Sequence, residues 1–343
     1  MSTPAPAPDL FIRLPHSWCG ADLDAIDAVA RAAEDLGFAG VSVQDHLLSG
    51  QAVAPCGHRH LEDDRMVLEP FSVLSYVAAR TSRIRLLTGV LVLPHRHPAW
   101  VAKTAATVDV LSRGRLTLGV GIGAPRDRKN EGNQNIGPHS DISAREHALV
   151  NVQGNRARFM DEALELLSLM WAEEPVVYEG ELFQMNGVDL RPRPVQRPRP
   201  PLWVGGRAEA ALRRAATLAD GWFPSQATVE VMTAGTARVR ELASAAGRPE
   251  PHFAVNMFVA CDRDGDLARD VIRDGLGHRF KGEEALFDST FAGTPADVVA
   301  RMRRYTAIGV SAFDMKLLPV NRADTLAQME LIASEVAPAL AAG

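Results

Sequence analysis

The sequence contains little cysteine, no long apolar run and no excess of positive charge. Its three cysteines (Cys19, Cys56 and Cys261) are odd in number and widely spaced, which predicts no disulfide framework and is typical of a reducing cytoplasm. No apolar run approaches the ~20 residues that span a bilayer, so we expect no membrane partner. A net charge of −5 offers no basic field to a phosphodiester backbone, which argues against nucleic acid as a partner.

The composition is that of a globular protein. With 343 residues, of which 46% are hydrophobic and 23% charged, the chain is long enough for one large barrel or two ordinary domains. Residues 1–8 lack the charged and apolar regions of a signal peptide, so we expect them to form a loose N-terminal tail.

One short segment has the spacing of a metal cluster. Cys56, His58 and His60 alternate and could place three ligands together. Structural zinc usually has four ligands, however, and no second cysteine pair with suitable spacing is present. We therefore favour a solvated or substrate-facing loop and expect no metal.

Strand-length apolar runs alternate with stretches that have apolar residues at helical spacing. The expected strands are Asp9–Leu14, Val41–Val43, Leu86–Pro94, Arg115–Gly123, Leu202–Val204, Asp220–Phe223, Phe253–Ala260 and Ala312–Leu318. The expected helices include Leu23–Leu36, Pro70–Arg80, Asn155–Glu173, Glu209–Leu218, Val229–Ala245, Pro295–Ile308 and Ala323–Leu340. Between Arg191 and Pro201, a proline-rich connection should lie extended over the surface. This alternation predicts an α/β fold, a single parallel (β/α)8 TIM barrel over residues 1–343.

A doubly wound open sheet is the alternative to the barrel. In that fold a glycine-rich turn follows the first strand, with an acidic ribose-binding residue in the same unit. Here Gly119, Gly121 and Gly123 belong to the fourth strand, and no suitable acid follows them. These glycines either make room for a ligand where the strand runs out into a loop, or only relieve crowding between strand and helix.

Two long segments interrupt the alternation. Both the loop Leu47–Leu68 and the polar segment Ala124–Gln153 follow strands, so both should emerge at the carboxyl face of the barrel, where active sites are built. Long connections in compact domains are usually functional lids or disordered excursions. We expect residues 124–153 to be an inserted loop and a candidate substrate lid, with a solvated insertion of no role as the alternative.

Asp45 and His46 end the second strand at the same face. Histidine exchanges a proton near neutral pH, so His46 is a candidate catalytic residue; the alternative is a histidine that caps the strand end. Neighbouring side chains in a strand point to opposite faces. One of the two should therefore turn toward the pocket while the other makes loop contacts.

Gly205 and Gly206, between an apolar strand and a helix, have the form of an anion site. Glycines permit a backbone nest, and free amides with the positive helix terminus favour phosphate. An ordinary strand-to-helix turn is an equal alternative. Asp220 and Trp222 could support this turn from the next strand, although core packing is the more ordinary role for Trp222.

Several longer motifs resemble the luciferase-like monooxygenase family, whose members are flavin- and deazaflavin-dependent barrel enzymes. They cover most of the chain: Arg96-His97-Pro98, Asp109-Val110-Leu111-Ser112, Gly114-Arg115, Tyr178-Glu179-Gly180, Pro194-Val195-Gln196-Arg197-Pro198, Pro200-Pro201-Leu202-Trp203-Val204-Gly205-Gly206, Ala219-Asp220-Gly221-Trp222 and Phe291-Ala292-Gly293-Thr294-Pro295. The resemblance implies a cytoplasmic bacterial oxidoreductase whose cofactor lies at the carboxyl face of a (β/α)8 barrel.

The resemblance also assigns site residues. It implies a non-proline cis peptide at Gly89-Val90 that backs the cofactor ring, and a histidine on the second strand, here His46, that acts as a catalytic acid or base. The cofactor-binding residues that it implies are Gly89, Val90, Gly121, Gly123, Arg156, Gly205 and Gly206, and we add Asp45, at the end of the second strand, as a further candidate cofactor contact. Residues 124–153 depart from the short acidic and aromatic turn of the family, so substrate recognition does not carry over.

Two cofactors fit the resemblance. The favoured one is coenzyme F420, with hydride transfer to or from a small organic substrate and His46 as proton donor or acceptor. The alternative is an FMNH2-dependent two-component monooxygenase, in which a separate reductase supplies reduced FMN that reacts with oxygen. A non-catalytic flavin-binding protein is a second alternative. The resemblance also implies a homodimer.

Overall fold

The computed structural model describes residues 6–17, 22–47, 67–123, 146, 150, 155–172, 175–319 and 321–342. Its strands are β1 (Asp9–Arg13), β2 (Gly40–Val43), β3 (Arg85–Thr88), β4 (Leu91–Val92), β5 (Leu116–Gly121), β6 (Val176–Glu179), β7 (Gln184–Val188), β8 (Leu202–Val204), β9 (Gly221–Trp222), β10 (His252–Cys261), β11 (Thr290–Gly293) and β12 (Ala312–Leu317). Its longer helices are α1 (Leu23–Asp35), α2 (Pro70–Arg80), α3 (Pro98–Leu111), α5 (Arg156–Ala172), α6 (Glu209–Thr217), α7 (Val229–Ala245), α8 (Gly265–Leu276), α10 (Pro295–Thr306) and α11 (Arg322–Leu331).

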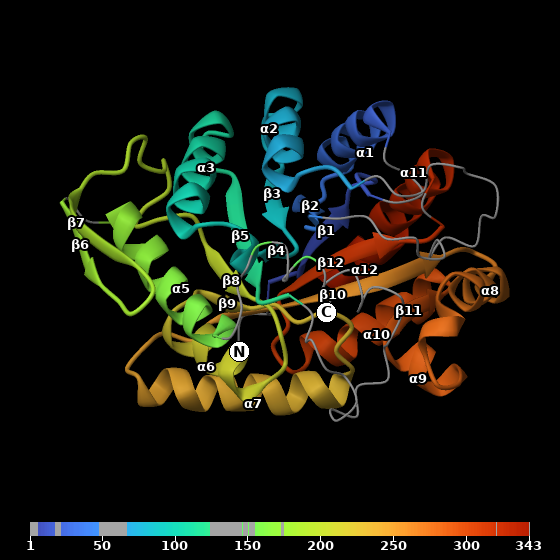
Figure 1. Ribbon diagram of the computed structural model, residues 1–343. Coiled ribbons are helices and arrows are strands. Elements are labelled where there is room, and N and C mark those ends of the chain that lie inside the picture. Colours follow the sequence, from blue (N-terminus) through green and yellow to red (C-terminus); the bar gives the residue numbers. More distant parts are fainter. Residues whose placement is uncertain are drawn as a thin grey trace.

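The strands close into a parallel barrel. In the order β1-β2-β3-β5-β8-β9-β10-β12 each strand pairs with the next in parallel, and β12 returns to pair with β1. Helices surround this barrel (Figure 1). The single (β/α)8 barrel predicted from the alternation is therefore confirmed.

The third barrel strand is not continuous. We expected one strand over Leu86–Pro94, but β3 ends at Thr88 and β4 begins at Leu91, with a cis Gly89-Val90 peptide between them and a 3-10 turn, η2 (Leu93–His95), after them. The cis peptide that the family resemblance implied is present.

Glycines on β5 make room for this break. A Cβ on Gly119 would lie 2.2 Å from the Thr88 carbonyl oxygen, and a Cβ on Gly121 would lie 2.7 Å from Val90 Cγ2. Crowding is therefore part of the reason for these glycines, but the neighbour that they accommodate is the adjacent strand rather than a helix.

The sequence patterns missed two insertions. The antiparallel pair β6 and β7 follows α5 and lies at the left edge of the molecule in Figure 1. Between β10 and α10 the chain adds α8, a 3-10 turn η3 (Gly277–Arg279), α9 (Glu283–Asp288) and β11, which pairs with the carboxyl end of β10. β6 and β7 are short and largely exposed, so they carry little of the apolar alternation that identifies a strand.

The last predicted helix, Ala323–Leu340, is interrupted. The chain forms α11, then a π-helical turn, η4 (Ile332–Val336), and then α12 (Ala337–Ala341). Pro338 has no backbone N–H to donate to the preceding turn, and wider turns accommodate such a gap in the hydrogen-bond ladder.

The proline-rich connection has neither helix nor strand between residues 189 and 201, as predicted. The buried carboxylate of Asp109 anchors it by accepting hydrogen bonds from the Val195 and Gln196 backbone amides at 2.7 and 3.0 Å. This contact holds the proline-rich segment against the last turns of α3.

Several predictions concern residues outside those described. Cys56, His58 and His60 lie there, as do residues 1–5 of the predicted tail and, apart from Glu146 and Val150, the predicted lid at residues 124–153. Among the described helices, none combines the length and the apolar character needed to cross a membrane.

Candidate active site

Most of the predicted site residues line one cavity of about 350 Å³. Its size lies within the range of roughly 300–1,000 Å³ that is typical of small-molecule sites. Among its lining residues are Asp45, His46, Gly89, Val90, Gly121, Gly123, Gly205 and Gly206. Arg156, the first residue of α5, does not line it, so the structure gives no support to that predicted cofactor contact.

Of the two candidate residues after β2, Asp45 and His46, Asp45 is the one whose side chain contacts the neighbouring loop. Its buried carboxylate accepts hydrogen bonds from the Val92 backbone amide at 2.8 Å and from both terminal nitrogens of Arg96, at 2.5 and 3.0 Å. These partners come from β4 and from the residue after η2. Asp45 therefore holds the end of the broken third strand, and its oxygens are already engaged.

His46 faces the cavity beside a carboxylate that sequence reasoning missed. Its Nδ1 lies 3.4 Å from Oε2 of Glu146, while the Leu47 backbone amide donates to the other oxygen of Glu146 at 2.6 Å. The Glu146 side chain is 1% exposed, and both residues line the cavity. Glu146 comes from the segment that we predicted as a lid, where no local pattern distinguishes it from other acidic residues.

Two further histidines lie near this strand end. Burial lowers the pKa of His95, which also lines the cavity. His16 is fully buried: the Gln44 amide donates to its Nε2 at 3.0 Å, which leaves the ring proton on Nδ1 to donate to the Leu14 carbonyl at 2.9 Å. Burial lowers the pKa of His16 to about 4. His16 therefore remains neutral and ties the ends of β1 and β2 together.

A buried polar network lies next to the cis peptide. Arg13 on β1 pairs with Asp314 on β12 and donates to the Gly89 carbonyl oxygen at 2.8 Å. Ser42 donates to the other oxygen of Asp314, and Asn256 donates to Asp314 at 2.7 Å. A buried ion pair persists where further hydrogen bonds satisfy its atoms, as they do here. The network joins four barrel strands to the peptide that the family resemblance places behind the cofactor.

The turn after β8 is a backbone cradle without side chains at residues 205 and 206. Gly206 has a positive φ of 105°, and a Cβ on Gly205 would lie 3.2 Å from the Phe223 carbonyl oxygen. Trp222 supports this turn, because its indole N–H donates to the Gly206 carbonyl at 2.8 Å while its ring packs over Gly235. Asp220 instead accepts from the Leu202 amide at 2.8 Å and pairs with Arg199, so it supports the start of β8.

The cradle and the break in the third strand suit a flat, anionic ligand. Backbone without side chains at the ends of β5 and β8 lets a ring and a phosphate approach closely, and the exposed Gly206 has the positive φ that occurs in anion-binding backbone nests. The described residues thus fit an isoalloxazine-type cofactor.

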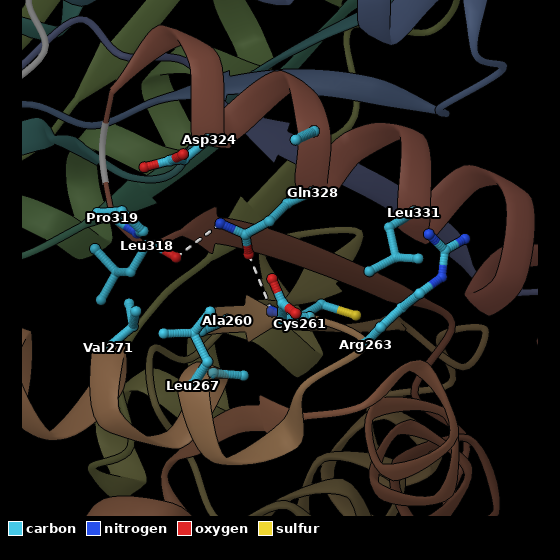
Figure 2. Close-up of a pocket in the computed structure, with 13 residues that line it drawn as sticks. Ala260, Cys261, Arg263, Leu267, Val271, Leu318, Pro319, Asp324, Gln328 and Leu331 are labelled. Atoms are coloured by element: carbon cyan, nitrogen blue, oxygen red, sulfur yellow. Dashed lines mark hydrogen bonds between the residues drawn. The ribbon is translucent and has the colours of Figure 1, made fainter.

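A larger hollow of about 420 Å³ lies elsewhere, between α8 and α11 (Figure 2). There Gln328 donates to the Leu318 carbonyl at 2.7 Å and accepts from the Cys261 amide at 3.0 Å. Burial raises the pKa of the Cys261 thiol to about 12, so this sulfur is not a reactive thiolate. None of the predicted site residues lines this hollow.

The sequence model of the luciferase-like monooxygenase family matches residues 12–288. The chain belongs to this family. Luciferase-like proteins of this kind are oxidoreductases, and the match spans the barrel strands from β1 to β10 together with the cavity-lining residues on them. The family resemblance stated from the motifs is confirmed.

Known relatives differ in cofactor. The FMNH2-dependent dimethylsulfone monooxygenase of Pseudomonas putida is 25% identical over 275 residues, which cover 71% of each chain. Among solved structures, the monooxygenase RslO1 of Streptomyces bottropensis has a TM-score of 0.77 with 23% identity, covering 96% of this chain and 99% of its own. The coenzyme F420-dependent tetrahydromethanopterin reductase of Methanopyrus kandleri has a TM-score of 0.73 with 20% identity, covering 97% and 99%. At these identities the solved structures establish the fold alone.

Proposed function

We propose that this luciferase-like protein is a coenzyme F420-dependent oxidoreductase that transfers hydride to or from a small organic substrate. The observation that carries the proposal is that His46, with Glu146 beside its Nδ1, lines the same cavity as the glycine cradle. When bound, the deazaflavin would supply a two-electron hydride carrier. A hydride acceptor or donor such as a carbonyl or alcohol also needs a proton partner, which His46 provides.

Most of the proposed cofactor contacts are made at glycine positions, where the backbone is accessible. Gly89 and Val90 would back the ring, Gly121 and Gly123 would lie along its edge, and the turn at residues 205–206 would hold the phosphate. Asp45 acts in this scheme through Arg96 and the Val92 amide, which fix β4, rather than on the cofactor. A contact from Arg156 to the anionic part of the cofactor stays a prediction.

His46 would move the proton. If Glu146 accepts the hydrogen on Nδ1, the ring is held in the tautomer that leaves Nε2 to exchange a proton with the substrate oxygen. The Leu47 amide donates to the same carboxylate and keeps it oriented. Glu146 is then a positioning residue, and His46 is the residue that contacts substrate.

An FMNH2-dependent monooxygenase is the second candidate function. It is favoured by the 25% identity to the dimethylsulfone monooxygenase over 275 residues. That function would require a separate flavin reductase. It would also require the cavity to be shielded from water during the reaction, and we propose residues 124–153 for that task. In either case we propose a homodimeric enzyme acting on a small molecule in the cytoplasm.

Cofactor binding decides between these candidates. The purified protein is titrated separately with coenzyme F420 and with FMN, and binding is followed by cofactor fluorescence. The proposal expects tight binding of coenzyme F420 and its reduction by at least one member of a panel of secondary alcohols. Binding of FMN alone contradicts it, and tight binding with no turnover in any redox assay favours a non-catalytic binding protein.

His46→Gln tests the proton role. The variant should retain cofactor affinity and lose turnover at least about tenfold, which corresponds to ~1.4 kcal/mol. The matched control is His252→Gln, an exposed histidine at the start of β10. If His46→Gln turns over like the control, His46 has no part in the mechanism.

A further inference from the structure

One end of the cavity carries two cationic side chains around a single phenyl ring. The Lys316 ammonium nitrogen lies 5.1 Å from the centroid of the Phe258 ring, and the Arg279 guanidinium carbon lies 5.6 Å from the same centroid. All three residues line the cavity, and Lys316 is only 9% exposed. They come from β12, β10 and η3, so the barrel and the insertion after β10 build this corner together.

The position of Lys316 follows from strand alternation. On β12 the side chains of Asp314 and Lys316 are two residues apart and so share the inner face of the barrel. Asp314 lies deeper and already binds Arg13, Ser42 and Asn256. Lys316 is one step nearer the carboxyl face, where the cavity opens.

The local electrostatics favour an incoming anion. Burial lowers the pKa of Lys316 well below its ordinary value, and the charges of Arg13 and Arg279 lower it further, while Asp314 acts in the opposite direction. An oxyanion beside Lys316 and Arg279 would favour the charged form of Lys316 and pair with the Arg279 guanidinium. Arginine also presents paired donors that match a carboxylate or a phosphate.

We propose that Lys316 and Arg279 form a subsite for an oxyanion, a carboxylate or a phosphate, carried by the organic substrate. The assignment to the substrate rests on the proposed function, because it takes the cofactor to lie along the glycine cradle. The proposed cofactor contacts are Gly89 and Val90 in the broken third strand, Gly121 and Gly123 at the end of β5, and the cradle after β8. Around the barrel, β9 and β10 separate β8 from β12 on one side, and β1 and β2 separate the third strand from β12 on the other.

Simple anions test the subsite. The protein, saturated with whichever of coenzyme F420 or FMN it binds, is titrated calorimetrically with benzoate, phenyl phosphate and neutral benzamide. We expect benzoate or phenyl phosphate to bind at least about tenfold more tightly than benzamide. Which of the two binds more tightly identifies the oxyanion as carboxylate or phosphate. Equal binding of all three probes, or binding of none, overturns the proposal.

Three variants localise the effect. Lys316→Met and Arg279→Met should each reduce the preference for the anionic probe at least about tenfold while leaving cofactor affinity within about threefold. Lys281→Met removes an exposed charge two residues after Arg279 and should retain the preference. Methionine suits the buried position of Lys316, because apolar residues of similar volume often replace buried charges without loss of stability.

The two proposals fail differently. Loss of cofactor affinity in Lys316→Met or Arg279→Met, with the probe preference intact, would assign the cations to the cofactor's own anionic tail and overturn the subsite. Failure of the wild type to bind either cofactor would overturn the proposed function. The preference for anionic probes, and its loss in the two variants, would still be measured on the cofactor-free protein and would decide the subsite separately.

Discussion

Replacing each of two glycines on β5 by alanine should impair a different property of the protein, stability at Gly119 and cofactor binding at Gly121. Because the two residues are two positions apart, a Cβ on either would lie on the same face of the strand. Neither residue has a positive φ, so the backbone itself accepts alanine at both positions. They differ in what the added methyl group would meet. Gly119 faces the backbone of Thr88, whereas Gly121 faces a terminal methyl group of Val90.

Gly119→Ala should destabilise the barrel strongly. The new Cβ would lie 2.2 Å from the Thr88 carbonyl oxygen, whereas ordinary contacts begin at 3.4 Å, so β3 and β5 must separate by about 1 Å. Overpacking of this kind costs about 1–3 kcal/mol. Separation also breaks the hydrogen bond from Thr88 Oγ1 to the Gly119 carbonyl, 2.7 Å long, which adds about 1 kcal/mol. We expect a total loss of about 3 kcal/mol in the free energy of unfolding.

Gly121→Ala should leave stability nearly unchanged and weaken cofactor binding instead. Its Cβ would lie 2.7 Å from Val90 Cγ2, and a rotated or displaced Val90 side chain relieves this contact at about 0.5–1.5 kcal/mol. Alanine also lowers the conformational entropy of the unfolded chain relative to glycine, which stabilises the folded state by about 0.4–1 kcal/mol and offsets much of that cost. Val90 lines the cavity, so its displacement narrows the proposed ring site.

Chemical denaturation followed by tryptophan fluorescence, combined with cofactor titration, separates the two effects. Trimming the displaced side chain in Gly121→Ala/Val90→Ala should restore part of the cofactor affinity. Equal stability of the two single variants would refute the packing argument. Unchanged cofactor affinity in Gly121→Ala would remove Val90 from the proposed ring site.

Two further predictions concern the supports of the cavity. His16 has a folded-state pKa of about 4 against an ordinary value of 6.5, so the unfolded chain binds more protons between these values and stability falls as the pH drops through that window, by up to about 3 kcal/mol. Denaturation at several pH values should show a smaller loss in His16→Gln than in wild type or in the exposed control His252→Gln; an identical pH profile would contradict this. Trp222→Phe and Trp171→Phe each remove one indole hydrogen bond to a backbone carbonyl and should both lose about 1–3 kcal/mol of stability. Only Trp222→Phe, which frees the Gly206 carbonyl, should weaken cofactor binding in a fluorescence titration, and equal weakening in both would argue against the phosphate turn.

The parts of the fold that were predicted well carry their signals locally. The helices over Pro70–Arg80 and Val229–Ala245 have the predicted bounds, and each begins after a residue whose side chain accepts from the first turn, Glu69 and Thr228. The buried barrel strands are short apolar runs bounded by turns. By contrast, β11 and α8 fall where we assigned no element, and their role depends on pairing with the end of β10 rather than on their own pattern.

The residues of the candidate site likewise fall into those that the sequence predicts and those that only the fold brings to the cavity. His46 and the turn at residues 205–206 follow directly after predicted strands, so their place at the carboxyl face could be argued from position alone. Glu146 and Arg279 reach the cavity from segments where only the folded chain shows their neighbours. The reason for Gly119 depends on Thr88, 31 residues earlier, whose carbonyl comes close only in the folded chain.

One signal for the cationic corner was nevertheless present in the sequence. The segment Ala312–Leu317 is a buried strand in which Asp314 and Lys316 occupy alternate positions among apolar residues. Charges at that spacing inside a barrel strand share the interior face, where a side chain must either pair within the core or line the site. Arg13, likewise at the end of an apolar strand, is the partner that satisfies Asp314. Arg13 donates to the Gly89 carbonyl in the cis peptide and also lines the cavity, and Lys316, two residues after Asp314 on β12, lines the cavity as well, so the charges on the inner face of β1 and β12 lie along one path from the core to the candidate site.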